Sequence, residues 1–253
     1  MLSENKAKAK LGRGEVAVGC MTMFVQPAVV EYIGRAGFDW VMFDGEHGPV
    51  TPESVEIGVM AAENVGLTPL GRVPVNRPEV ILRFMDTGLA GVLVPHVDTA
   101  ADARAAVTAV KYHPRGERGL AGVRASGYGA VPQPEYVARA NAETMVLAMI
   151  ESVTAVDNIE AIAAVDGLDV LNVGTSDLSQ SMGRPGQKDD PKLIEMVEHV
   201  IKVGRTAGKA VAVGGGASSD WPRWRAAGVN WFGTSVPELM LNAGRQTCAL
   251  IRG

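Results

Sequence analysis

Short apolar stretches alternate with segments of helical periodicity along almost the whole chain. Runs such as Gly91-Val92-Leu93-Val94 are apolar without alternation, which is typical of strands in a parallel sheet covered on both faces. Eight such stretches, rich in apolar and β-branched residues, predict strands at 16–23, 40–43, 68–73, 91–97, 144–150, 168–173, 210–213 and 230–233. The segments that follow them predict amphipathic helices at 26–35, 52–65, 78–87, 100–110, 153–165, 191–207, 219–227 and 237–251.

Eight strand-then-helix units in 253 residues predict a (β/α)₈ TIM barrel of the α/β class. At this length one barrel is as reasonable as two domains, but no linker or change in composition interrupts the alternation. We therefore expect a single domain over residues 1–253. The polar segment 1–15 predicts a short extra N-terminal helix.

The segment 112–134 is the irregular part of the pattern. It is rich in Gly, Pro and Arg and separates the helix after the fourth strand from a short predicted helix at 135–141. Connections of this length in a compact domain are usually lids, binding loops or oligomer contacts, and a mobile surface loop is the alternative. Its arginines Arg115, Arg118 and Arg124 suit carboxylates or a partner subunit, and the sequence does not choose between these.

Composition excludes several classes of function. The net charge is -4, and no basic stripe with interleaved aromatic residues is present, so nucleic acid is not expected as a partner. No apolar run is long enough to span a bilayer, and a cytoplasmic enzyme is the default expectation. Cys20 and Cys248 are far apart and outside any metal-ligand spacing, so neither a disulfide framework nor a cysteine zinc site is expected.

Polar side chains gather where the predicted strands end, and in a TIM barrel these ends form one face that carries the active site. The second strand is followed by Asp44, Glu46 and His47, within the run Phe43-Asp44-Gly45-Glu46-His47-Gly48-Pro49. The alternative for these acids is a helix cap before Thr51. The other strands contribute Arg72, His96, Glu151, Ser176 and Asp177 at their ends.

Glu151 and Asp177 form the candidate metal site. Glu151 ends the very apolar run 144–150, where a carboxylate rarely serves packing. Asp177 follows the neighbouring strand, and a helix N-cap is its structural alternative. Two carboxylates, with waters and substrate oxygens, are the usual ligands of Mg²⁺ or Mn²⁺. A Schiff-base lysine is not expected, because Lys209 precedes the seventh strand and Lys111 lies beyond a helix.

Six motifs resemble the HpcH/HpaI family of metal-dependent, class II pyruvate aldolases, in the family's order over nearly the whole chain. They are the run 43–49, Arg72-Val73-Pro74, Val94-Pro95-His96-Val97, Arg118-Gly119, Ile150-Glu151 and Gly174-Thr175-Ser176-Asp177-Leu178-Ser179. The resemblance implies a reversible cleavage of 4-hydroxy-2-oxo acids to pyruvate and an aldehyde. It also implies a homo-oligomer, commonly trimers paired into hexamers.

The resemblance further implies a role for each site residue. Glu151 and Asp177 bind a divalent cation, with Mg²⁺ or Mn²⁺ expected and Co²⁺ or Zn²⁺ as other candidates, and the cation chelates pyruvate. Arg72 contacts the keto oxygen, and His47 transfers protons through a water, oriented by Asp44 and by Asp86 as a second candidate. For Asp86 a plain surface charge is the preferred alternative. Backbone N–H groups around Gly174, Ser176 and Asp177 suit the pyruvate carboxylate.

Two positions depart from the family pattern. Thr175 stands where many relatives have a proline, and Met149 stands where a glutamine commonly precedes the metal-binding glutamate by two residues. Met149 therefore removes an amide from the expected pyruvate neighbourhood. Two alternatives stay open: a C–C lyase of the citrate-lyase-β or malyl-CoA-lyase kind, and a catalytically silent barrel that binds metabolites.

Overall fold

The computed structural model describes residues 4–215 and 218–253. Within these residues, eight parallel strands close into a barrel in sequence order, with β1 paired to β8. The strands are β1 (Ala17–Thr22), β2 (Trp40–Asp44), β3 (Thr68–Arg72), β4 (Gly91–Val94), β5 (Met145–Ile150), β6 (Val170–Gly174), β7 (Ala210–Gly214) and β8 (Trp231–Ser235). The predicted TIM barrel is confirmed.

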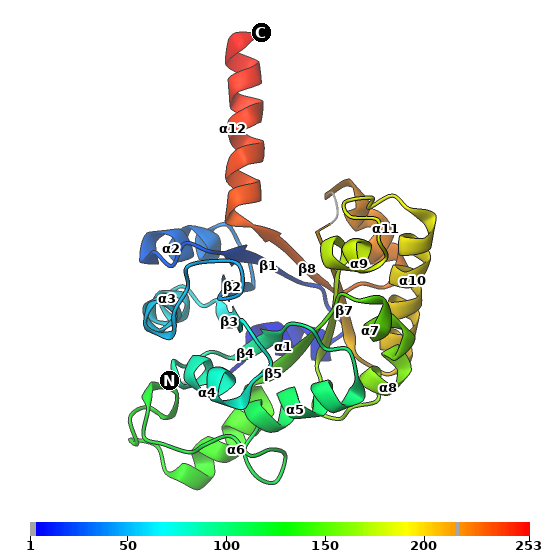
Figure 1. Ribbon diagram of the computed structural model, residues 1–253. Helices are drawn as coiled ribbons and strands as arrows, with labels where there is room; N and C mark the ends of the chain where they lie inside the picture. The colour runs from blue at the N-terminus through cyan, green and yellow to red at the C-terminus, as the bar shows by residue number, and fades with distance from the viewer. Residues whose placement is uncertain (1–3, 216–217) are drawn as a thin grey trace.

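Helices surround the barrel (Figure 1) and begin where the sequence provides helix-starting residues. Thr51 caps α3 in a capping box with Ser54, and Thr99 caps α5 in the same way with Asp102. The α-helices are α1 (Lys6–Gly12), α2 (Pro27–Arg35), α3 (Pro52–Asn64), α4 (Pro78–Asp86), α5 (Ala100–Val110), α6 (Gln133–Glu143), α7 (Val153–Asp157), α8 (Ile159–Ala163), α9 (Thr175–Ser181), α10 (Pro191–Thr206), α11 (Trp221–Ala227) and α12 (Val236–Arg252).

Several boundaries differ from the predicted ones for local reasons. β4 ends at Val94 instead of residue 97, because Pro95 follows and His96 has a left-handed backbone with φ 52°. The helix predicted at 153–165 is two short helices that meet at Asn158, whose side chain donates to the Asp98 carbonyl oxygen. The irregular segment 112–134 contains a 3₁₀ turn at Arg124–Ser126.

The core has two layers. The larger layer lies between the strands and the helices, and a smaller layer fills the barrel interior with inward-facing residues such as Met42, Leu70 and Leu147. Trp40 and Trp231 stack inside the barrel with ring centroids 4.8 Å apart. The Trp40 ring fits because Gly19 has no side chain, since a Cβ there would lie 1.9 Å from the ring.

The N-terminal helix closes one end of the barrel. Ala7 of α1 is fully buried with the interior layer, and its N–H donates to the Thr68 hydroxyl at 3.2 Å. Asn5 caps α1 and donates from its amide to the Ala90 carbonyl oxygen. Because these contacts are at the N-terminal ends of the strands, access to the interior is left at the C-terminal ends.

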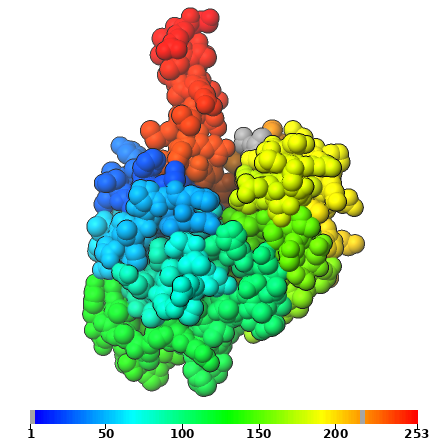
Figure 2. All heavy atoms as spheres, in the orientation of Figure 1, coloured from blue at the N-terminus to red at the C-terminus, as the bar shows by residue number. Residues whose placement is uncertain are grey.

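The last helix departs from a regular barrel. α12 projects away from the body instead of lying against it (Figures 1 and 2). The outer face of β1 and β8 is therefore not covered by α12. Val18 of β1, which pairs with Phe232 of β8, is 39% exposed. Its apolar side chains Leu239, Met240, Leu241, Leu250 and Ile251 are exposed. No helix among the described residues is long and apolar enough to cross a membrane.

Candidate active site

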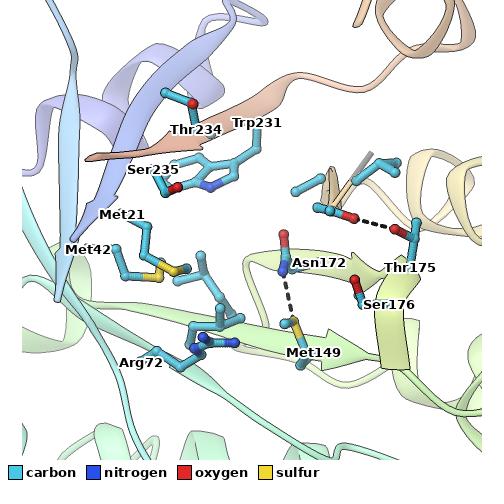
Figure 3. A pocket seen from close by; sticks show the side chains of 18 of the residues that line it. Met21, Met42, Arg72, Met149, Asn172, Thr175, Ser176, Trp231, Thr234 and Ser235 are labelled. Atoms are coloured by element: carbon cyan, nitrogen blue, oxygen red, sulfur yellow. Dashed lines mark hydrogen bonds between the residues drawn. The ribbon is translucent and has the colours of Figure 1, made fainter. Parts of the chain in front are cut away.

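A cavity of about 480 Å³ opens at the C-terminal ends of the strands, opposite α1 (Figure 3). This volume is in the range of small-molecule binding sites and much larger than a three-carbon acid. Its wall combines an apolar floor from the barrel interior with polar residues from the strand ends. Among those polar residues are His47, Arg72, Asn172, Ser176 and Asp177.

Asp44 and Arg72 form a buried ion pair at the ends of the neighbouring strands β2 and β3. Burial alone would raise the pKa of Asp44, but the hydrogen bonds and charge of Arg72 outweigh it and lower that pKa below its ordinary value. Burial would likewise lower the pKa of Arg72, and Asp44 outweighs it in the opposite direction. Both groups are therefore charged at neutral pH.

Glu46 lies between Arg72 and two histidines. Its Oε2 atom is 3.0 Å from Arg72 Nη1 and 3.9 Å from His47 Nε2, and its Oε1 atom is 3.8 Å from His96 Nε2. Within the described residues Oε2 is buried without hydrogen-bond geometry to any partner, although the guanidinium is close. The partner nearest to this carboxylate oxygen is therefore the charged guanidinium of Arg72.

His47 is oriented differently from the expectation. Asp44 Oδ1 accepts the backbone N–H of His47 at 3.2 Å, and both oxygens of Asp44 are engaged by Arg72. The imidazole itself is mostly exposed, with Glu46 as its nearest carboxylate. Asp44 therefore fixes the backbone of His47 and makes no contact with its ring that would orient it. Neither acid caps α3, since Thr51 does.

Glu151 is buried at the end of β5 and is held by His96. Its Oε1 atom accepts the His96 backbone N–H at 2.8 Å and lies 3.2 Å from His96 Nδ1. Burial raises the pKa of the Glu151 carboxyl, the His96 contacts lower it, and the negative charges of Glu46 and Asp177 raise it again, with a net increase. The left-handed backbone of His96 costs about 1–3 kcal/mol and is kept by these contacts.

Asp177 lies in the first turn of α9, directly after β6. The N-cap of α9 is Gly174, so Asp177 is inside the helix and is not its cap. Gly174 lets the two strands approach closely here, because a Cβ would lie 3.1 Å from Glu151 Cβ and 3.3 Å from Glu151 Oε2 and would press on that side chain. Thr175 donates from its hydroxyl to the Gly214 carbonyl oxygen at 2.7 Å, which fixes β6 to β7 beside the cavity (Figure 3).

The residues of this site fit a divalent cation with oxygen ligands. Glu151 and Asp177 are hard oxygen donors whose mutual charge raises the Glu151 pKa, a cost that a cation removes. Within residues 4–215 and 218–253, no group of three or more His, Cys, Asp or Glu side chains is arranged to hold a metal by itself. The fitting set is thus two carboxylates completed by water and substrate, as is common for Mg²⁺.

Asp86, Lys111 and Lys209 lie apart from the cavity. Asp86 ends α4 and pairs with the buried Arg118 at 2.7 Å, in a surface groove with Arg83 and Tyr128. Lys111 donates to the Thr144 carbonyl oxygen at 2.6 Å and Lys209 to that of Leu168 at 2.9 Å, both at the N-terminal ends of strands. Burial lowers the pKa of Lys111 to about 8, yet its position is remote from the site.

Sequence reasoning missed the residues that line the floor of the cavity. These face inward from the barrel strands and include Met21, Trp40, Met42, Asn172 and Trp231. The one available signal was Asn172, a polar residue inside the apolar run of β6. The apolar residues gave no signal, because a filled barrel interior has the same composition as a ligand cavity.

The fold and site define an α/β-barrel with a buried arginine and several carboxylates at the catalytic end of the strands. The family model described as HpcH/HpaI aldolase/citrate lyase matches residues 19–215. The chain belongs to this family and is accordingly a carbon–carbon lyase.

Individual relatives agree over nearly full length. The chain is 34% identical over 246 residues to 5-keto-4-deoxy-D-glucarate aldolase of Salmonella arizonae, covering 97% of this chain and 95% of that protein. It is similar to the solved structure of an HpcH/HpaI aldolase/citrate lyase family protein from Burkholderia cenocepacia, with TM-score 0.92, 31% identity and coverage of 98% and 100%. It is also similar to citrate synthase SbnG, with TM-score 0.88, 30% identity and coverage of 97% and 96%.

Proposed function

We propose that the protein is a divalent-metal-dependent aldolase that cleaves 4-hydroxy-2-oxo acids to pyruvate and an aldehyde and catalyses the reverse addition. The observation that carries this proposal is that the buried Glu151 lies within electrostatic reach of Arg72 and Asp177, which both line the cavity. A cation and a guanidinium are the groups that an enolate needs where its negative charge develops. The similarity to 5-keto-4-deoxy-D-glucarate aldolase supports the same reaction type.

Glu151 and Asp177 would hold the cation, and Mg²⁺ or Mn²⁺ suits their hard oxygen atoms. When bound, the cation supplies Lewis-acid polarisation of the keto group. Cleavage breaks the C3–C4 bond: the 4-hydroxyl loses its proton and becomes the aldehyde, and the bonding electrons form the enolate. A proton then adds to C3 and yields pyruvate.

Three residues of the chain contribute to these steps. Arg72, held charged by Asp44, directs its guanidinium at the keto oxygen and stabilises the enolate. His47 accepts the 4-hydroxyl proton through a water, and the Glu46 carboxylate lies 3.9 Å from its ring. Gly174 and Ser176, with the N–H groups that open α9, contact the pyruvate carboxylate.

A direct assay separates this proposal from a second candidate, a C–C lyase of the citrate-lyase-β or malyl-CoA-lyase kind that acts on CoA thioesters. The family description includes citrate lyase, and one similar structure is named citrate synthase. The protein would be incubated with Mn²⁺ and either a 4-hydroxy-2-oxo acid or a 3-hydroxy-acyl-CoA thioester. Pyruvate release from the oxo acid would be followed with lactate dehydrogenase, and cleavage of the thioester to a shorter acyl-CoA and a carbonyl compound would be followed by liquid chromatography. We expect metal-dependent pyruvate release from the oxo acid. Turnover of the thioester alone would favour the second candidate, and turnover of neither would favour a silent metabolite-binding barrel.

We also propose that the protein is a homo-oligomer, a trimer or hexamer. An isolated helix gains little stability in water without packing, so the exposed Leu239 and Leu250, which share one face of α12, need a covering surface, which a second copy supplies. The segment 112–134 is a further candidate contact. Light scattering of the purified protein tests the state. Leu250→Glu should reduce the mass and Arg245→Glu on the opposite face of the same helix should not, whereas a monomeric parent protein would exclude the proposal.

A further inference from the structure

Asn172 is a polar side chain on an apolar floor. It lies on the inward face of β6, since Val170, two residues earlier, belongs to the interior layer of the core. Around it the cavity wall is formed by apolar residues that include Leu147, Met149 and Trp231. A polar side chain in such a place needs a hydrogen-bond partner.

The partner that Asn172 has within the protein is weak. Its Nδ2 atom donates to the thioether sulfur of Met149 at 2.8 Å (Figure 3). Within the described residues the Asn172 side chain makes this one hydrogen bond. A thioether sulfur is a weak acceptor. The amide also has a second N–H and a carbonyl oxygen, so most of its hydrogen-bonding capacity faces the cavity.

Asn172 is close to the candidate metal site. It pairs with Met149 in the register of β5 and β6, and Glu151 follows Met149 by two residues. Gly174, two residues after Asn172 on the same face, has no side chain to separate the amide from Glu151 Oε2 and Met149 Cε. The amide therefore lies on the side of the cavity, lined by Gly174 and Asp177, that is next to the Glu151 carboxylate.

We propose that the side-chain amide of Asn172 binds an oxygen of the 2-oxo acid. In the protein without substrate this amide donates to Met149 instead. β6 would then supply the amide that β5 lacks at Met149. This inference rests on the proposed function. An oxygen of pyruvate that carries negative charge is a much better acceptor than a thioether, so binding exchanges a weak hydrogen bond for a charge-assisted one. The position deep on β6 assigns Asn172 to the pyruvate half of the substrate rather than to the aldehyde at the mouth.

The test uses pyruvate alone with the Mn²⁺-loaded protein, because an aldehyde is not needed. Deuterium exchange of the pyruvate methyl group gives KM and kcat, and calorimetric titration gives the pyruvate Kd. Asn172→Leu should raise both KM and Kd about 10- to 100-fold, the loss expected for a hydrogen bond to a charged group. It should leave kcat and Mn²⁺ affinity within about twofold, which separates substrate binding from damage to the metal site.

Two further variants complete the test. Met149→Gln in the Asn172→Leu background returns an amide to the cavity from β5 and should recover most of the pyruvate affinity. Asn230→Leu makes the same exchange at the opposite end of the barrel, where Asn230 accepts the Val211 N–H, and should leave the pyruvate KM unchanged. The inference about Asn172, but not the proposed function, would be overturned if Asn172→Leu kept the pyruvate KM of the parent protein. A loss of Mn²⁺ affinity in place of pyruvate affinity would have the same meaning. A parent protein without exchange would overturn the proposed function together with it.

Discussion

The Arg72 guanidinium holds the Asp44 carboxylate through two parallel hydrogen bonds, Nε to Oδ1 at 2.8 Å and Nη2 to Oδ2 at 2.6 Å. The remaining nitrogen, Nη1, lies 3.0 Å from Glu46. A guanidinium held in this way has a fixed plane and a fixed charge, which is what stabilising a developing oxyanion requires. Asp44 at the end of β2 and Glu46 just after it thus hold the guanidinium of Arg72, at the end of β3, in place.

Replacing Arg72 tests this role. Arg72→Ala should lower kcat about 10²- to 10³-fold, because one preorganised donor to the enolate oxygen is lost. Arg72→Lys keeps the charge without the two-pronged geometry and should recover only part of the rate. Steady-state kinetics would check this, with Arg83→Ala on the outside of α4 as the control. Unchanged kcat in Arg72→Ala would remove the guanidinium from the chemistry.

Asp44→Asn should lower the stability of the protein in a pH-dependent way. Removing one partner of a buried ion pair costs about 3 kcal/mol, and the folded pKa of Asp44 lies below its ordinary value. The stabilisation by Asp44 is therefore present above the ordinary pKa of 3.8 and is lost as the pH falls through the folded value. Urea unfolding of both proteins would show a difference at about pH 7 that shrinks toward about pH 3. A difference independent of pH would contradict the pairing.

Glu151→Gln should weaken cation binding. The neutral amide keeps the size of the side chain but loses the charge, and we expect the Mn²⁺ Kd to rise at least about 100-fold. Titration of Mn²⁺ followed by electron paramagnetic resonance measures this without any substrate. Glu160→Gln, the same exchange on the exposed side of α8, is the control. Equal Mn²⁺ affinity in the Glu151→Gln and parent proteins would exclude Glu151 as a ligand.

Lys111 should make the stability rise with pH. Burial lowers the pKa of its ammonium group from 10.5 to about 8, so between these values the unfolded chain binds more protons than the folded one. The free energy of unfolding therefore increases across that range. Lys111→Met should flatten the increase, measured by urea unfolding at several pH values. The same slope in both proteins would mean that the folded ammonium group keeps its ordinary pKa.

The regular part of this molecule was predictable from local sequence. Apolar runs without alternation identified the parallel strands, and their order placed Arg72, Glu151 and Asp177 on one rim, because strand ends of a barrel must converge. The pairing of Asp44 with Arg72 was not predictable, since it depends on rotamers and on the register between β2 and β3. The direction of α12 was likewise not predictable. An amphipathic pattern indicates that a helix has an apolar face, but it does not identify the surface that packs against that face.

The family departure at Met149 shows the same limit. The sequence indicated a missing amide next to Glu151, but the compensation by Asn172 lies on the neighbouring strand and appears only when the β5–β6 register is known. The ion pair of Asp86 with Arg118 could not be predicted either. Arg118 lies in the irregular segment 112–134, where no periodic pattern indicates which residues are in contact.

The central claim, a cation-assisted pyruvate enolate at Arg72, Glu151 and Asp177, is tested most directly by proton NMR of pyruvate in D₂O. The protein would be incubated with pyruvate alone, with and without Mg²⁺ or Mn²⁺, and the methyl signal followed over time. The account predicts metal-dependent loss of the methyl signal that chelation abolishes and Glu151→Gln suppresses. A methyl signal that persists with every divalent cation, in protein shown to bind Mn²⁺, would contradict it.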